Sequence, residues 1–252
     1  MRTPRRLPGL LFIAAFSMSG APALAAGETE WLVAPYLWYP DISIDQSSGE
    51  GGGGISASDL LSKTDAAGMV RAEVARNHWG LTVDYLFLSV SDSREVSLPL
   101  PPDTSTNVQA DLDLTVFEIA GFFRPSGNEE GINYLAGLRS IRAEKVLLIT
   151  PPAGPTQRRD GDESVTDVMF GARYLYRFNN RWDANLRGDY SLGDSEGTWN
   201  LMGGVSFRVN DLLAMNLSYR HASLEYEETV EGETNTTTIE LSGPLLGFLF
   251  RF

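Results

Sequence analysis

His221 and Ser223 are the two side chains of this sequence whose types and spacing come nearest to nucleophilic catalysis. An extended strand presents residues two positions apart on the same face. A histidine within reach of a serine hydroxyl can act as its general base, and a carboxylate can orient that histidine. Glu225, Glu231 and Glu233 follow closely enough in the chain to serve as that carboxylate.

The His-x-Ser spacing resembles that of outer-membrane lipid A deacylases, which makes an enzyme of this kind one alternative. A two-residue match recurs by chance, however. Alternation along the segment also places His221 on one face with Leu217 and Tyr219, which we expect to meet lipid. We therefore predict a structural histidine at the membrane interface, with no catalytic residue, cofactor or metal site. His78 beside Trp79 is expected to pack at the interface too.

Charged side chains recur on the strand faces that the alternation assigns to the inside of a barrel. In the segment 182–192, Asp183, Arg187 and Asp189 fall on the face opposite Trp182 and Leu186. Because unpaired charges away from water are costly, we expect these groups to pair. The predicted lumen network consists of Arg71, Glu73, Asp84, Glu118, Arg139, Arg173, Asp183, Arg187, Asp189, Arg220 and Arg251. The alternative is a charged constriction that selects ions, but the interspersed signs favour a structural network.

Segments in which apolar residues alternate with polar or small ones predict an all-β fold, an antiparallel transmembrane barrel of about ten strands, with eight or twelve as alternatives. No segment after residue 25 offers 18 consecutive apolar residues, so a spanning structure must close on itself to satisfy its backbone. The predicted strands cover residues 30–43, 69–77, 81–91, 108–124, 132–144, 166–178, 182–193, 198–209, 213–226 and 236–252.

A soluble β-sandwich would show the same alternation, so the placement of aromatic residues decides between the two. They concentrate toward strand ends, where interfacial girdles lie. The predicted girdle residues are Trp31, Trp38, Tyr39, Trp79, Tyr134, Tyr174, Tyr176, Trp182, Tyr190, Trp199, Tyr219 and Tyr226.

Connections between the predicted strands alternate in length. Short turns at 78–80, 125–131, 179–181 and 210–212 are rich in Gly, Asn, Asp or Pro. Longer polar loops are predicted at 44–68, 92–107, 145–165 and 227–235, with a short one at 194–197. The first holds a glycine cluster and a possible helical turn at 58–61. This asymmetry predicts that both termini lie on the periplasmic side.

The N-terminus has the features of a secretory signal peptide. Arg2, Arg5 and Arg6 precede an apolar run, and Ala23-Leu24-Ala25 forms a cleavage pattern. We expect a signal peptide at 1–25, a barrel domain at 26–252, and export by the general secretory route to the outer membrane. The formal charge of −13 comes without a basic stripe that could bind a nucleic-acid backbone, and the chain has no cysteine.

The last strand carries a further signal. Phe248, Phe250 and Phe252 share a face and end the chain, which resembles the sorting signal read by the barrel-assembly machinery. Because Leu241 and Leu246 differ in parity, a bulge is expected near 243–244, where a proline cannot donate to the ladder.

With these segments placed, the chain resembles a porin-like family of proteobacterial outer-membrane β-barrel proteins. The likeness rests on Trp31-Leu-Val-Ala-Pro-Tyr-Leu-Trp38, Trp79-Gly-Leu-Thr-Val-Asp84-Tyr85, Phe170-Gly-Ala-Arg-Tyr174, Arg187-Gly-Asp189-Tyr190 and Gly243-Pro-Leu-Leu-Gly247-Phe-Leu-Phe-Arg-Phe252. The resemblance implies a barrel and a location in the outer membrane, but no activity that could be assigned to particular residues.

Three functions therefore remain open at the level of the sequence: a structural or loop-mediated barrel with a filled lumen, a narrow porin-like passage for small solutes, and a deacylase-like enzyme. We favour the first. The expected partners are outer-membrane lipid and lipopolysaccharide, together with periplasmic chaperones and the assembly machinery during biogenesis; nucleic acid is not expected. The sequence leaves the oligomeric state open.

Overall fold

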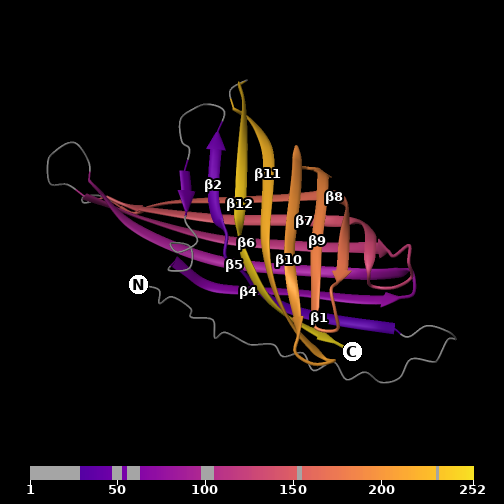
Figure 1. The fold of residues 1–252 in the computed structure, drawn as a ribbon. Coiled ribbons are helices and arrows are strands. Elements are labelled where there is room, and N and C mark those ends of the chain that lie inside the picture. The colour runs from indigo at the N-terminus through magenta and orange to yellow at the C-terminus, as the bar shows by residue number, and fades with distance from the viewer. Residues whose placement is uncertain (1–28, 47–52, 56–62, 98–104, 152–154, 231–232) are drawn as a thin grey trace, which may run out of the picture.

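A computed structural model describes residues 29–46, 53–55, 63–97, 105–151, 155–230 and 233–252. In these residues the chain forms one antiparallel β-sheet that closes on itself (Figure 1). The first strand pairs with the last: the backbone N–H groups of Trp31 and Phe252 each donate to the carbonyl of the other residue, at 3.1 and 2.9 Å. No helix in the described part of the chain is long and apolar enough to cross a membrane. The expected signal peptide and the expected helical turn at 58–61 lie outside the described residues.

Ten strands form the wall, which confirms the predicted barrel. In this count β1 and β2 are one strand interrupted at residues 39–40, and β3 is a short addition that pairs with β2. The strands are β1 (Thr29–Trp38), β2 (Asp41–Gln46), β3 (Gly53–Ile55), β4 (Thr64–Arg76), β5 (Trp79–Ser97), β6 (Ser105–Phe123), β7 (Gly131–Thr150), β8 (Gln157–Arg177), β9 (Trp182–Gly193), β10 (Gly197–Arg208), β11 (Leu213–Val230) and β12 (Glu233–Arg251).

Several strands are longer than the sequence pattern predicted. The ranges 92–107, 145–165 and 227–235 were expected to be loops, yet β5–β6, β7–β8 and β11–β12 stay paired through most of them. The alternation pattern identifies a strand by one apolar and one polar face. These extensions lack it: most are polar on both faces, and the end of β7 is apolar on both at residues 146–149. Paired hairpins therefore rise above the membrane-facing band at the end of the barrel that we call the loop end, opposite the turn end where the short turns lie (Figure 1).

The outer face is apolar and exposed, as an outer-membrane barrel requires. Val168, Leu186 and Leu217 are each more than half exposed, and so are Tyr134 and Tyr176. Trp38 is an exception among the predicted girdle residues. It points into the lumen and is only 8% exposed, because β1 is apolar on both faces and alternation alone does not tell them apart.

The bulge predicted near 243–244 is wrong. The β11–β12 register runs without a shift from Leu213 opposite Phe250 to Val230 opposite Glu233. Leu241 lies opposite Ala222 and packs against an apolar cluster inside the barrel, whereas residue 246 faces out. The two leucines therefore differ in parity because they belong to different faces.

The irregularity falls on the neighbouring strand instead. Tyr39 donates its N–H to the carbonyl of Pro244 at 3.0 Å. Pro244 has no N–H to donate in return, and Pro40 lacks one as well. The strand breaks here into β1 and β2, and its backbone lies so close to β12 that a Cβ at position 243 would stand 2.0 Å from the carbonyl oxygen of Tyr39.

We predict that Gly243→Ala destabilises the barrel, by about 1–3 kcal/mol or more, because the added methyl group would overlap backbone atoms that the β1–β12 seam holds in place. The measurement is the denaturant midpoint of heat-modifiable gel migration for the refolded protein. Gly188→Ala is the matched control, since the nearest atom to its Cβ would be a leucine methyl at 3.8 Å. Equal midpoints for the two variants would contradict the close approach.

Candidate functional site

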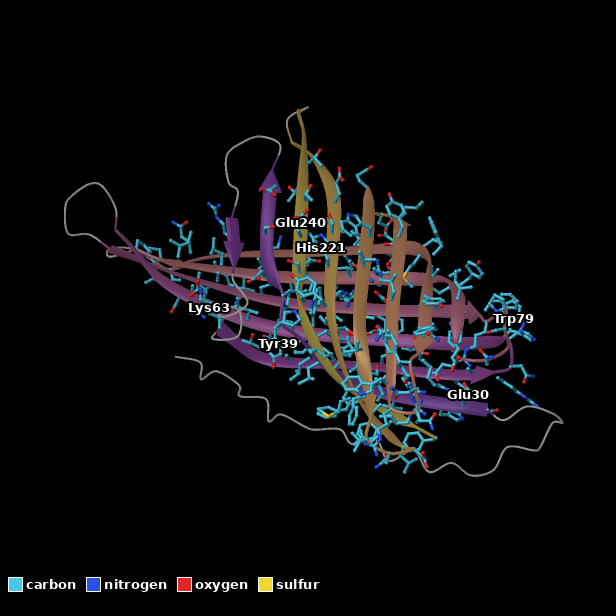
Figure 2. The ribbon with its side chains drawn as sticks, in the orientation of Figure 1. Glu30, Tyr39, Lys63, Trp79, His221 and Glu240 are labelled. Carbon is cyan, nitrogen blue, oxygen red and sulfur yellow. The ribbon has the colours of Figure 1, made fainter. Side chains whose placement is uncertain are left out.

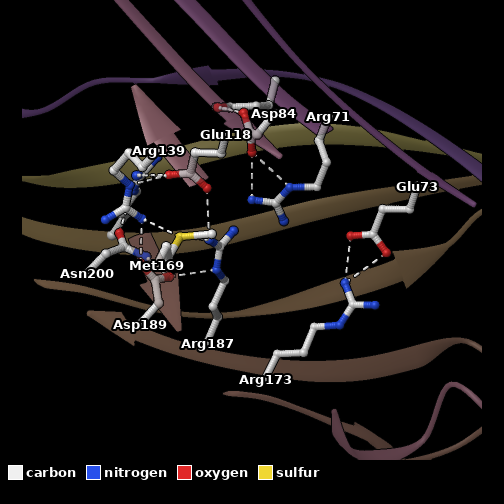
Figure 3. Close-up of polar contacts among 12 residues, drawn as sticks. Arg71, Glu73, Asp84, Glu118, Arg139, Met169, Arg173, Arg187, Asp189 and Asn200 are labelled. Atoms are coloured by element: carbon white, nitrogen blue, oxygen red, sulfur yellow. Dashed lines mark hydrogen bonds and ion pairs between the residues drawn. The ribbon is translucent and has the colours of Figure 1, made fainter. Parts of the chain in front are cut away.

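Four charged side chains form a closed ring in the middle of the lumen (Figure 3). Arg139 on β7 donates from Nε to Glu118 on β6 at 2.8 Å and from Nη2 to Asp189 on β9. Arg187, also on β9, donates from Nε to Asp189 at 2.8 Å and from Nη2 to Glu118 at 2.9 Å. Signs alternate around the ring, so each carboxylate lies between two guanidinium groups.

A second group of three side chains adds to this arrangement. Asp84 on β5 accepts hydrogen bonds from the Tyr36 hydroxyl at 2.6 Å and from Nε of Arg71 at 2.9 Å. Tyr36 and Arg71 come from the neighbouring strands β1 and β4, so three successive strands of the wall contribute to this group.

Arg220 on β11 completes the arrangement, with mainly neutral partners. Its Nε donates to the amide oxygen of Asn200 at 2.6 Å, and its guanidinium lies 4.5 Å from the ring centroid of Trp38. Glu118 is farther away, at 3.9 Å. The Asn200 amide in turn donates to Asp189 at 2.9 Å, which ties Arg220 to the ring.

We call these residues the charged layer; they are Tyr36, Arg71, Asp84, Glu118, Arg139, Arg187, Asp189, Asn200 and Arg220. The four ring residues are at most 7% exposed. Charges taken out of water cost several kcal/mol each unless they are paired and hydrogen-bonded, so each carboxylate of the charged layer depends on its arginine partners.

On the loop side of the charged layer part of the interior is apolar. Met69, Leu86, Leu88 and Val90 pack there with Trp38 in one buried cluster. Near the ring, Asp167 accepts hydrogen bonds from the Ser191 and Ser195 hydroxyls at 3.2 and 2.6 Å. Side chains therefore fill the middle of the barrel and its loop half.

On the turn side of the charged layer the charges form smaller groups. Arg173 pairs with Glu73 at 2.6 Å. Asp183 accepts from Arg177 at 3.0 Å and lies 3.4 Å from Arg208. Arg124, Glu129 and Arg251 also lie at this end.

The structure brings seven of the predicted lumen residues together in the charged layer. Glu73, Arg173, Asp183 and Arg251 lie apart from it, toward the turn end. Tyr36 is not among the predicted lumen residues, because Ala34, Tyr36 and Trp38 look like a lipid face. Asn200 is also missing from the predicted network, although alternation places it inside; an uncharged amide gives no sequence signal of its partners.

His221 and Ser223 are on the outer face, near the edge of the apolar band that faces the loop end. The His221 ring lies 4.7 Å from that of Trp199. Ser223 is 7% exposed and lies directly opposite Glu240 on β12; Figure 2 labels His221 and Glu240. No hydrogen bond joins these three side chains within the described structure. Glu225 is exposed, while Glu231 and the side chain of Glu233 lie outside the described part.

Comparisons with known proteins find similarity in structure but not in sequence. No family model matches the chain, and no curated protein is detectably similar to it in sequence. The outer-membrane protease OmpT from Escherichia coli superposes with a TM-score of 0.58 at 7% identity, over 91% of this chain and 99% of that one.

Two further solved structures align over 90% of this chain. The translocator domain of the autotransporter NalP from Neisseria meningitidis has a TM-score of 0.47 at 11% identity, over 90% of its length. The Ail protein of Yersinia pestis has a TM-score of 0.35 at 11% identity, over all of its length. The protein has the outer-membrane β-barrel fold. At such low identity the likeness indicates the fold alone.

We predict that Arg187→Ala lowers the free energy of unfolding by about 3–5 kcal/mol, because it leaves Asp189 and Glu118 buried with one arginine fewer. Denaturant titration of the refolded protein measures this loss. Lys145→Ala is the control, since Lys145 pairs with Glu163 on the surface, where both side chains are more than half exposed. That change should cost no more than about 1 kcal/mol. A similar loss in both variants would contradict a buried ring.

Proposed function

We propose that this protein is an outer-membrane barrel with a closed lumen, and that it acts through its framework and its loop-end hairpins rather than by passing solutes. The charged layer carries this proposal. A pore needs a continuous water column, but here buried side chains from both sides of the barrel meet and satisfy one another. The apolar cluster above the layer adds a second barrier.

Orientation and partners belong to the same proposal. The turn end, with the start of β1 and the final residue, would face the periplasm, and the long hairpins would face outward. The apolar band would contact lipid and lipopolysaccharide. Phe248, Phe250 and Phe252 all face out at the end of β12, where the assembly machinery would read them.

The test is conductance in a planar bilayer. We expect the unmodified protein to conduct poorly or not at all, because ions meet paired side chains. Arg187→Ala should open a measurable conductance, since it breaks the ring and leaves space on the lumen axis. Lys145→Ala should stay closed. Large and steady conductance in the unmodified protein, unchanged by Arg187→Ala, would reject the closed lumen and favour a narrow porin-like passage.

A second candidate function is hydrolysis of acyl esters of outer-leaflet lipid, and the register of β11 and β12 favours it. Glu240, which is not among the carboxylates predicted from the sequence, lies opposite Ser223, two residues along β12 from the partner of His221. Cβ atoms of directly opposite residues are about 5 Å apart. Ser223 would attack the ester carbonyl and His221 would take its proton and return it to the leaving alcohol; water would then release the acid from the enzyme, with Glu240 orienting the histidine.

This candidate predicts that the refolded protein releases fatty acid from lipopolysaccharide or phospholipid, and that Ser223→Ala abolishes the release. Catalytic hydrogen bonds are often long in a free enzyme and shorten when substrate binds, so their absence among the described residues is compatible with this candidate. The matched control is Ser242→Ala, because Ser242 is on the same face and opposite His221. Loss of activity in the Ser242 variant alone would move the nucleophile to β12. Fatty acid release equal to a protein-free blank would reject the candidate.

A further inference from the structure

The lumen is hollow on the turn side of the charged layer. Two adjoining cavities, of about 110 and 340 Å³, share Leu32, Glu73, Glu129 and Arg251 in their walls. Tyr36, Arg71 and Arg187 of the charged layer line the smaller one. We call the two together the turn-end chamber. It is closed at the layer and extends to the last residue of the chain.

Three arginines of the turn-end chamber share one bonding arrangement. Each forms its ion pair through Nη1: Arg124 with Glu30 at 2.7 Å, Arg173 with Glu73 at 2.6 Å, and Arg251 with Glu129 at 2.6 Å. In all three the Nε–H group is buried and has no hydrogen-bond partner in the described structure. A buried donor without an acceptor is costly, so these positions point to an acceptor that the protein itself does not supply.

The arginines of the charged layer differ in this respect. Arg71, Arg139 and Arg187 all bond carboxylates through Nε together with Nη2. That edge of the guanidinium is the fork that holds a carboxylate with two parallel hydrogen bonds. In the charged layer the Nε and Nη2 donors of these arginines already bond carboxylates of the protein. Arg173 and Arg251, in contrast, have an Nε–H without a partner in the described structure and line a cavity.

The rest of the chamber wall is partly apolar. Leu32, Leu175, Leu245 and Leu249 line the smaller cavity alongside the arginines. Above the Arg173 guanidinium lies the Phe122 ring, 4.4 Å away at its centroid. A ligand that satisfies this wall needs a charged acceptor at one end and an apolar portion at the other.

We propose that the turn-end chamber binds a small organic carboxylate with a short apolar chain, which enters from the turn end. Its carboxylate would take the Nε edges of Arg173 and Arg251, and its chain would lie along Leu32 and Leu245. Glu129, in the connection between β6 and β7, already holds Arg251 and would compete with the ligand for it. The site does not depend on conduction, because it lies on one side of the charged layer.

Titration calorimetry on the full barrel in amphipol tests this, with hexanoate as the probe and hexanamide as its neutral isostere. We expect hexanoate to bind with a Kd in the millimolar range or tighter, at least 10-fold more tightly than hexanamide or acetate. The paired variant Arg173→Gln with Glu73→Gln should weaken binding at least 10-fold without leaving a buried charge alone. Arg181→Gln, in the exposed turn after β8, is the control and should bind like the unmodified protein.

Glu129→Gln separates a ligand site from a merely structural group of arginines, since removing the competing carboxylate should tighten hexanoate binding several-fold. Equal binding of acetate and hexanoate would overturn the apolar part of the proposal. Equal binding of hexanamide and hexanoate, or no heat with any probe in a protein that keeps its heat-modifiable migration, would overturn the site and leave the chamber to water.

Discussion

The buried ring of Glu118, Arg139, Asp189 and Arg187 is the interaction on which the interior depends. A ten-stranded barrel is narrow, and each of these charges would be expensive to bury alone. Two arginines that each bridge the same two carboxylates remove that cost in one step, with every Nε used. The ring also joins β6 and β7 to β9, past the strand β8 between them, so side-chain pairing reinforces the backbone ladder.

The ring explains why the two halves of the lumen differ. Toward the loop end, Trp38, Met69 and their neighbours exclude water, and the Trp38 ring covers the face of Arg220. Toward the turn end, the interior opens into a chamber. Three of its arginines form ion pairs through Nη1, and their Nε–H donors have no partner in the described structure. In the function proposed above, the paired charges of the middle close the barrel to passage, while the unpaired donors of the turn end leave a place for a ligand.

The outer face obeys a simpler constraint. Lipid selects apolar side chains at alternate positions, and Leu186 and Leu217 illustrate the result. Beyond the apolar band this selection ends, so the hairpins of β5–β6 and β7–β8 continue without the alternation of apolar and polar faces. His221, Ser223 and Glu240 lie near this boundary, where a polar cluster can meet lipid headgroups without being buried in hydrocarbon.

The residues alone predict a barrel, about ten strands and the inward direction of the charges, because alternation, turn length and the closing of a spanning sheet are local or topological constraints. It could not decide which charges meet. Arg139 and Asp189 are 50 positions apart in the chain, and Tyr36 on β1 contacts Asp84 on β5, past the strand β4 that lies between them. Three further features also required the tertiary structure. The strand extensions depend on pairing within their hairpins, and the inward directions of Trp38 and Leu241 depend on the cluster that they contact inside the barrel.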